Sequence, residues 1–247
     1  MVFPSSCTNF VASFRETMAN ILNIETSTTV CSVSLSSDGE IVAHCENYDG
    51  LTHATLLSKF ADEMLNTAKR KELQLDAIAV SIGPGSYTGL RIGLSQAKGL
   101  AFGLDLPLIG VNTLQLLAVT AMFQEYFEDD TLYVPMLDAR RMEVYTAVYN
   151  SALDAIMEPQ AMILDKDSFS SLLENRHLVM IGNGSQKAKD VIKHANASFM
   201  PNVKPVAVDM MALAEKAFKE SRFIDVAYST PLYLKDFQAT VPKKKIF

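Results

Sequence analysis

The sequence predicts an α/β protein made of two consecutive domains, each a mixed sheet with flanking helices in the order β-β-β-α-β-α. Each half of the 247-residue chain opens with the period-two alternation of strands and continues with helical patterns between short apolar runs. An acidic run at 128–130 separates the halves. We therefore expect a disordered extension at 1–19, a first domain at 20–128 and a second domain at 129–247.

The first half begins with three predicted strands, at 21–26, 29–36 and 40–46. Asp38-Gly39 is the expected hairpin turn between the second and third of them. Alternating helices and strands follow, at 54–69, 77–82, 89–104, 107–111 and 113–127. Asn112 supplies an N-cap for the last of these helices.

The second half repeats this order. Its first three strands are expected at 131–138, 142–150 and 160–164. A helix at 165–175 with Asp165 or Asp167 as N-cap, a strand at 177–181 and helices at 186–195 and 210–222 come next. Asp209 is the expected N-cap of the final helix. The sequence leaves open whether that helix packs back on the first domain.

The glycine-rich stretch at 83–93 lies where a buried strand turns into a helix. Four glycines at such a turn indicate tight backbone geometry or close approach of another group, and the free amides of the helix can hold an anion. The stretch matches neither the P-loop nor the G-x-G-x-x-G pattern. A plain tight turn and an anion site are both open at this point.

The helices at 54–69 and 89–104 are apolar on two sides, and such helices are buried on two sides. In the second of them Gly89, Gly93 and Ala97 form a row of small residues that leaves room for another helix. We expect the two helices to form a partner-binding face. The alternative is that both are enclosed within their own domain.

Composition narrows the functional classes. The net charge of −6 and the absence of a basic face argue against binding tRNA alone, and Lys243 to Lys245 are typical of a solvated end. Three cysteines without a C-x-x-C motif fit free thiols in a reducing cytoplasm. No apolar run approaches the ~20 residues of a membrane span, and the first residues do not form a secretory signal. We expect Met18 to be the natural start.

Several motifs carry a resemblance to a known family. They are Ile-Glu-Thr-Ser at 24–27, the glycine-rich stretch at 83–93, Leu-Asp-Ala-Arg-Arg-Met-Glu-Val-Tyr at 137–145 and Pro-Leu-Tyr-Leu at 231–234. Over about 21–235 the chain resembles the TsaB (YeaZ) family, which is glycoprotease-like and belongs to the actin, Hsp70 and sugar-kinase superfamily. The resemblance implies two tandem actin-like, ribonuclease H-like domains.

The resemblance also implies a function. It is that of a non-catalytic partner of the TsaD threonylcarbamoyltransferase, required for threonylcarbamoyladenosine beside the anticodon of tRNAs that read codons starting with A. The resemblance implies that a TsaE-like ATPase joins these two proteins and that the isolated chain forms a homodimer. It also implies that the chain contacts tRNA only as part of the complex. The implied interface residues are His53, Leu56, Phe60, Met64, Gly89, Ile92, Gly93, Gln96, Ala97 and Leu100.

A catalytic or nucleotide site is expected to be absent or degenerate, with no metal and no cofactor. The resemblance implies that the catalytic paralogue, TsaD, carries a metal-binding His-x-x-x-His motif. In this chain Leu57 stands at i+4 after His53, and leucine cannot ligate a metal. Superfamily hairpins need glycine beside phosphates, and this chain has other residues there. We expect weak or absent ATP binding at the degenerate loops, which contain Glu25, Ser27, Asp138, Arg140, Gly182 and Gly184.

The sequence offers three alternatives to this function. An ATP-dependent small-molecule phosphotransferase is the main alternative, in which Glu25 and Asp138 hold a magnesium ion. A peptidase lacks a metal pair or triad, and Ser86 does not lie in a G-x-S-x-G elbow. Independent tRNA binding is disfavoured by the net charge.

Overall fold

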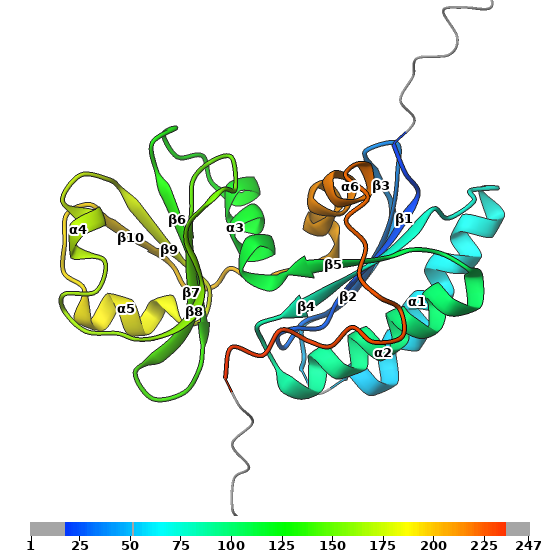
Figure 1. Cartoon of the computed structure of the whole chain (residues 1–247), viewed down its shortest axis with the longest axis horizontal. Coiled ribbons are helices and arrows are strands. Elements are labelled where there is room, and N and C mark those ends of the chain that lie inside the picture. The colour runs from blue at the N-terminus through cyan, green and yellow to red at the C-terminus, as the bar shows by residue number, and fades with distance from the viewer. Residues whose placement is uncertain (1–17, 51, 236–247) are drawn as a thin grey trace, which may run out of the picture.

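The computed structural model describes residues 18–50 and 52–235, so residues 1–17 of the predicted extension at 1–19 and the lysines at 243–245 lie outside it. Within the described residues the chain forms two five-stranded sheets (Figure 1). Their strand orders are β3-β2-β1-β4-β5 and, read from the corresponding edge, β8-β7-β6-β9-β10. The third, second, first, fourth and fifth strands of each half thus lie side by side in the same order. This repeated topology confirms the predicted duplicated fold.

The first sheet is mixed because β1 pairs antiparallel with β2 and parallel with β4. Its strands are β1 (Ile21–Glu25), β2 (Cys31–Ser37), β3 (Glu40–Asn47), β4 (Ala77–Gly83) and β5 (Leu108–Asn112). The helices of this half are α1 (His53–Arg70), α2 (Tyr87–Leu104) and α3 (Thr113–Gln124). The Asn112 side chain caps α3 as expected, since its Oδ1 accepts hydrogen bonds from the N–H groups of Leu114 and Gln115.

The second sheet repeats the antiparallel β6–β7 and parallel β6–β9 pairs. Its strands are β6 (Leu132–Asp138), β7 (Glu143–Tyr149), β8 (Ala155–Ile163), β9 (Leu178–Ile181) and β10 (Ala197–Met200). The helical elements are α4 (Ser170–Leu173), α5 (Ser185–Val191), the 3₁₀ helix η1 (Ala207–Met210) and α6 (Met211–Lys219).

Several sequence predictions in this half are wrong. The third strand starts at Ala155 instead of 160, and the helix expected at 165–175 shrinks to a single turn. The Asp165 carboxylate accepts hydrogen bonds from the Asp167 N–H and the Ser168 hydroxyl, so it closes a turn ahead of the helix, whose N-cap is Phe169. β10 was not expected, because four half-buried residues at a sheet edge are too short for a readable period.

The predicted capping role of Asp209 is also wrong. It lies within η1, and the N-cap of α6 is Met210, which forms no side-chain capping bond. Burial raises the pKa of the Asp209 carboxyl, while a hydrogen bond with Thr120 of α3 opposes that rise. Asp209 thus joins η1 to α3 instead of starting α6.

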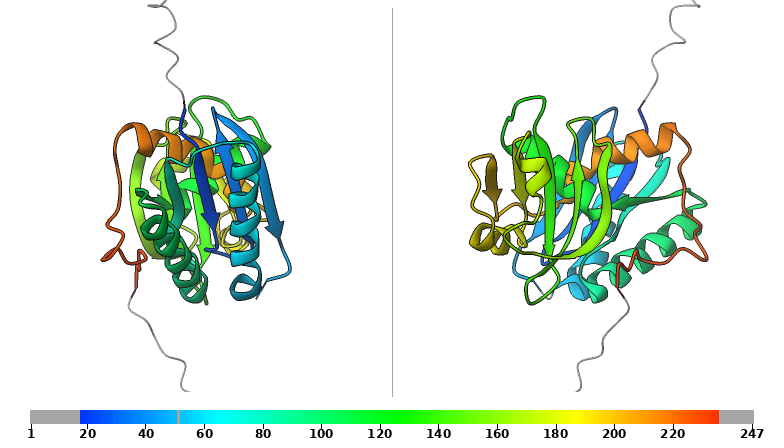
Figure 2. Two further views of the ribbon diagram at one scale, coloured as in Figure 1. Left: turned by 90° about the vertical axis from the view of Figure 1, so that its right-hand side faces the viewer. Right: turned by 60° about the vertical axis from the view of Figure 1, so that its left-hand side comes forward.

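Alternate residues of β1 face opposite sides of the first sheet, as the strand period requires. Leu22 and Ile24 pack with the core under α1 and α2, whereas Ile21 packs with the core under α3 and α6. Figure 2 (left) shows α1 and α2 side by side on the outer face of this sheet. Both helices therefore cover their own domain, and only their outward stripes are free.

Helix α3 lies between the two domains and is buried on both sides. Leu116 and Val119 pack with the core of the first sheet, while Leu114 and Leu117 pack with the second. Each fully buried leucine contributes roughly 1.5–3 kcal/mol, so α3 joins the domains through its apolar faces. Helix α6 contacts β1 and β5, so the end of the second half lies on the first sheet (Figure 1).

The segment after α6 runs along α2 and returns to the second domain (Figure 1). Ile224 pairs with Leu108 at the edge of the first sheet, and the Lys98 ammonium donates to the carbonyl of Ser229 at 2.6 Å. The Leu232 N–H then donates to the carbonyl of Ile82 at 2.7 Å. One side of α2 is thus covered by the same chain. In the described part of the chain, no helix is long and apolar enough to cross a membrane.

Candidate functional site

The glycine-rich turn at 83–93 folds around the hairpin that follows β1. The Ser86 N–H donates to the Ser27 carbonyl at 2.6 Å, and the Thr26 hydroxyl donates to the Gly89 carbonyl at 2.8 Å. A Cβ at Gly89 would overlap the Thr26 carbonyl oxygen, and one at Gly93 would overlap the Thr26 hydroxyl. Glycine is required here because the backbone of the same chain comes close.

The N-terminal amides of α2 are therefore partly used within the protein. The Ser86 side chain accepts a hydrogen bond from the Gly89 N–H at 3.2 Å, which is an ordinary N-cap. Of the two alternatives that the sequence left open, the structure favours the tight turn. The space in which an anion would approach the first hairpin is filled by Thr26 and Ser27, both of which are buried.

Glu25 ends β1 as a fully buried carboxyl group. Its Oε1 accepts hydrogen bonds from the N–H and the hydroxyl of Ser27, both at 2.5 Å, and its Oε2 has no hydrogen-bond partner in the described chain. Burial raises the pKa of Glu25 to about 7, against the hydrogen bonds from Ser27 that lower it. This carboxyl group is thus occupied with holding its own hairpin.

The corresponding hairpin of the second domain is exposed and charged. Asp138, at the end of β6, accepts a hydrogen bond from the Lys187 ammonium at 2.7 Å and one from the Arg140 N–H at 2.6 Å. Burial raises the pKa of Asp138, but the bonds from Lys187 and Arg140 outweigh it and leave that pKa below its usual value. The Asp138 N–H donates to Asn183 Oδ1 at 2.9 Å, which ties this hairpin to the next loop.

The turn of that hairpin holds two consecutive arginines in the left-handed region. Arg140 has φ 70° and Arg141 has φ 50°, and both residues are exposed. The left-handed conformation costs roughly 1–2 kcal/mol for a residue with a Cβ, and Gly or Asn adopts it with less strain. Arg140, one of the residues of the expected degenerate loops, therefore lies in a strained turn that faces solvent.

The loop at 182–184 is also closed by packing. Gly182 has φ 94°, and a Cβ there would lie 2.6 Å from Leu117 Cδ2 and 2.7 Å from the Met136 carbonyl oxygen. The Gly184 N–H donates to the same Met136 carbonyl at 3.0 Å. Both glycines therefore allow the loop to pack on β6 and α3, which is a structural reason for them.

A magnesium–nucleotide, which the actin-like fold implies, does not fit these residues. Glu25 is enclosed and engaged with Ser27, and Asp138 is paired with Lys187. No bare glycine faces outward from either hairpin, because the first is Glu25-Thr26-Ser27 and the second is 138–141. Bringing a triphosphate to either loop would require breaking these contacts. No catalytic step is therefore derived through such a group.

The ten interface residues implied by the family resemblance divide into two sets. The half-buried ones, which reach the surface of α1 and α2, are Leu56, Phe60, Ile92, Gln96 and Leu100. The buried ones are His53, Met64, Gly89, Gly93 and Ala97. Within the first set the Gln96 amide oxygen accepts a hydrogen bond from the Ser58 hydroxyl at 3.0 Å, which joins the two helices at the surface.

The expected role of the small-residue row needs correction. Gly93 faces Thr26, and Ala97 is fully buried in the core beneath α1 and α2, so this row admits the chain's own hairpin and not a partner helix. The outward glycines of α2 are Gly99 and Gly103, at which an added Cβ would meet nothing within 4 Å. The 3.6-residue period does not show which of two small rows faces the sheet.

Other candidate reactive groups have structural roles. His53 is 8% exposed, and its Nε2 lies 3.0 Å from the Val30 carbonyl oxygen, with Leu57 buried at i+4. In the described residues no three His, Cys, Asp or Glu side chains are grouped as metal ligands. Burial, together with the charge of Glu25, raises the pKa of Cys31 to about 11, so its thiol stays protonated at neutral pH.

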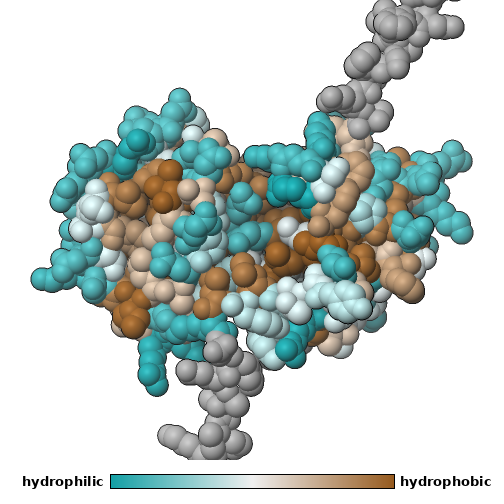
Figure 3. Space-filling model, in the orientation of Figure 1, coloured by the Kyte–Doolittle hydropathy of each residue, from teal (hydrophilic) through white to brown (hydrophobic). Residues whose placement is uncertain are grey.

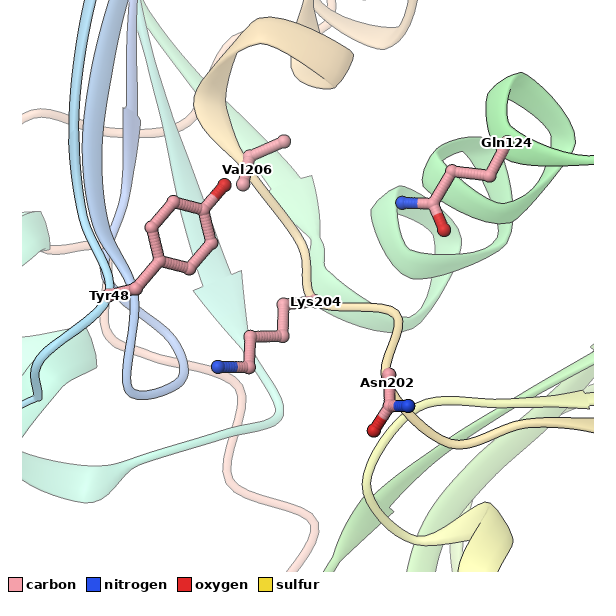
Figure 4. Close-up of a pocket in the computed structure, with 5 residues that line it drawn as sticks. All are labelled: Tyr48, Gln124, Asn202, Lys204 and Val206. Atoms are coloured by element: carbon pink, nitrogen blue, oxygen red, sulfur yellow. The ribbon is translucent and has the colours of Figure 1, made fainter.

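Two cavities lie away from the hairpin loops. The larger, of about 270 Å³, is a polar opening lined by Tyr48, Gln124, Asn202, Lys204 and Val206 (Figure 4). Its Lys204 ammonium lies 5.5 Å from the centre of the Tyr48 ring. The smaller, of about 50 Å³, includes Gly110 of β5. Figure 3 shows apolar residues gathered across the middle of the molecule in the orientation of Figure 1. Neither cavity gathers a nucleophile with a base.

Sequence reasoning missed several residues that determine these loops. Thr26 was not singled out, although it occupies the space beside two glycines. Lys187 pairs with Asp138 across 49 residues, a separation that no local motif reveals. Arg91 donates to the Tyr233 hydroxyl at 2.9 Å and stacks over Tyr87, which holds the final segment on α2. The motif at 231–234 was the available signal for this last contact.

The fold and loops define a class: an actin-like protein of two duplicated domains whose nucleotide-type loops are filled or paired within the chain. The family model described as TsaD, tRNA N6-adenosine threonylcarbamoyltransferase, matches residues 50–243. The solved structure titled YeaZ from Pseudomonas aeruginosa superposes with a TM-score of 0.74 at 25% identity, covering 88% of this chain and all of that one.

Curated relatives are similar over most of the chain. The tRNA threonylcarbamoyladenosine biosynthesis protein TsaB of Escherichia coli K12 is 31% identical over 227 residues, which are 87% of this chain and 94% of that protein. The protein of the same name from Bacillus subtilis 168 is 33% identical over 177 residues, 70% of this chain and 75% of its own length. The chain belongs to the TsaB (YeaZ) family.

Proposed function

We propose that this chain is a non-catalytic partner of a TsaD-like threonylcarbamoyltransferase in forming threonylcarbamoyladenosine in tRNA. The observation that carries the proposal is the match to TsaB proteins over most of the chain, named for the biosynthesis of that nucleoside. The engaged carboxyl groups of Glu25 and Asp138 support a partner role over an ATP-dependent phosphotransferase. A TsaE-like ATPase is the proposed third component, in the cytoplasm.

The test is reconstitution. The TsaD-like and TsaE-like proteins of the same cell are combined with ATP, threonine, bicarbonate, the enzyme that makes the threonylcarbamoyl donor, and an unmodified tRNA. Modification is measured with and without this chain. We expect modification to require the chain, and we expect titration calorimetry with MgATP to show no turnover by the chain alone. Full modification without the chain, or ATP turnover by it, contradicts the proposal.

We further propose that α1 and α2 form the docking face, both for the TsaD-like protein and for a second copy of the chain. The outward stripe of Leu56, Phe60, Ile92, Gln96 and Leu100 supports this, because apolar side chains remain partly exposed there. Gly99 is the site for a test, since a larger side chain there meets nothing in the monomer. The variant Gly99→Leu is expected to weaken association while the chain stays folded.

The control for that test is a leucine on α6, in the variant Lys216→Leu, which adds a similar apolar side chain away from α1 and α2. Sedimentation of the isolated chain and co-purification with the TsaD-like protein report the two associations separately. If Gly99→Leu associates as the unaltered chain does in both measurements, the docking face lies elsewhere.

A further inference from the structure

The turn between β6 and β7 presents two exposed arginines whose guanidinium groups have no partner among residues 18–50 and 52–235. Arg140 and Arg141 are exposed, and neither guanidinium forms a hydrogen bond or ion pair with the part of the chain that the structure describes. The Arg140 charge helps to lower the pKa of Asp138, but the Asp138 Oδ1 already accepts a hydrogen bond from Lys187. These two positive charges therefore face solvent.

The charged groups beside the two arginines are paired with one another, so they do not cancel the charge of the arginines. Lys187 neutralises Asp138, and Lys235 at the end of the described chain forms an ion pair with Glu143 of β7. The two arginines thus add two net positive charges to a small region of a chain whose net charge is −6. A local positive region on an acidic protein directs association with an anionic partner.

The backbone of this turn does not explain the arginines. Both residues have positive φ, where Asn and Gly are unstrained, so the fold would be served better by those residues. Strain that persists at an exposed turn points to a function of the side chains. A guanidinium presents a planar fork of donors that matches two oxygens of a phosphate.

We propose that Arg140 and Arg141 bind the phosphate backbone of RNA when this chain is part of its complex. Neither arginine lines either of the two cavities described above, and both are exposed, so the geometry favours a polymer lying across the turn over an enclosed small anion. The choice of RNA over an acidic peptide rests on the proposed function. The proposal adds a direct RNA contact to a chain whose total charge disfavours binding RNA alone.

The test uses the full chain in complex with its TsaD-like partner and a fluorescently labelled, unmodified tRNA. The double variant Arg140→Asn with Arg141→Gly keeps the turn and removes both charges. We expect its tRNA Kd to rise about tenfold at low salt, with the slope of log affinity against log salt concentration reduced by roughly 1.4–1.8. Co-purification with the partner is expected to be unchanged.

The matched control is Lys166→Gln with Lys189→Gln, which removes two exposed charges from the same domain. We expect this control to leave the tRNA Kd within about twofold. Unchanged tRNA affinity in the arginine variant overturns the proposal, and so does loss of co-purification, which would assign the pair to an acidic protein surface. Failure of the unaltered chain to join the complex would count against the proposed function instead, so the two failures are distinguishable.

Discussion

The two domains contain the same hairpin after their first strand, and the two hairpins have opposite surroundings. In the first domain Glu25 is enclosed, and the residues after it fill the space beside the glycine-rich turn. In the second domain Asp138 is paired with a lysine, and the arginine turn is open to solvent. Of the two corresponding hairpins in this duplicated fold, the first is therefore packed inside the protein and the second presents charged side chains at the surface.

The comparison predicts that the first hairpin tolerates no added atoms. We expect Gly89→Ala to lower the free energy of unfolding by about 3 kcal/mol, because its Cβ would overlap the Thr26 carbonyl and no flexible side chain can yield. Urea denaturation measures the change. A loss below about 1 kcal/mol would mean that the turn and the hairpin are not tightly joined.

A second prediction concerns pH. The pKa of Glu25 is about 7 in the folded chain and 4.5 as an ordinary value, so the folded state holds the proton more tightly. Its contribution to stability is complete below pH 4.5 and is lost as the pH rises through 7, which amounts to roughly 2–3 kcal/mol between pH 5 and pH 8.

The variant Glu25→Gln cannot titrate at this position, so we expect its free energy of unfolding to fall less between pH 5 and pH 8. Urea denaturation of both proteins at the two pH values measures how far the two declines differ. Parallel pH profiles of the two proteins would show that Glu25 is ionised in the folded chain at both pH values, and the buried description of the first hairpin would be incorrect.

The second hairpin is predicted to respond in the opposite direction. The pKa of Asp138 is lowered, so its contribution is present above its unfolded value and is lost as the pH falls. We expect Asp138→Asn to destabilise the chain by about 0.5–1 kcal/mol at pH 7, because the pair with Lys187 is partly exposed. At pH 3 the effect should largely vanish, and denaturation at the two pH values tests this.

The smallest expected effect has the opposite sign. Gly99→Ala adds a methyl group on the outward side of α2, where nothing lies within 4 Å, and removes a glycine from a helix interior. We expect the free energy of unfolding to rise by roughly 0.5–1 kcal/mol. Measured beside Gly89→Ala, it is the matched control on the same helix, and destabilisation by Gly99→Ala would indicate that the outward stripe is packed.

Much of the fold was predictable because local signals agreed with it. Period-two strands, the Asp38-Gly39 turn and the Asn112 cap each marked an element that the structure contains. The errors fall where a local signal was ambiguous. Asp165 caps a turn instead of a helix, and β10 is too short to show a period. The bonds from Asp167 and Ser168 select a turn over a helix at Asp165, whereas β10 takes its conformation from pairing with β9, which lies farther away in the sequence.

The sequence predicted where the candidate loops lie in the chain, but not which residues surround them in the fold. The sequence by itself determined the duplicated order of elements, the glycines at the turn and the missing second histidine after His53, because these depend on residue type and spacing alone. Only the tertiary structure decided that Gly93 faces Thr26, that Lys187 meets Asp138 and that the arginine turn stays open. Such contacts join residues far apart in the chain. They decide how buried each group is, and burial together with charged partners decides its pKa and how much room remains for a larger side chain.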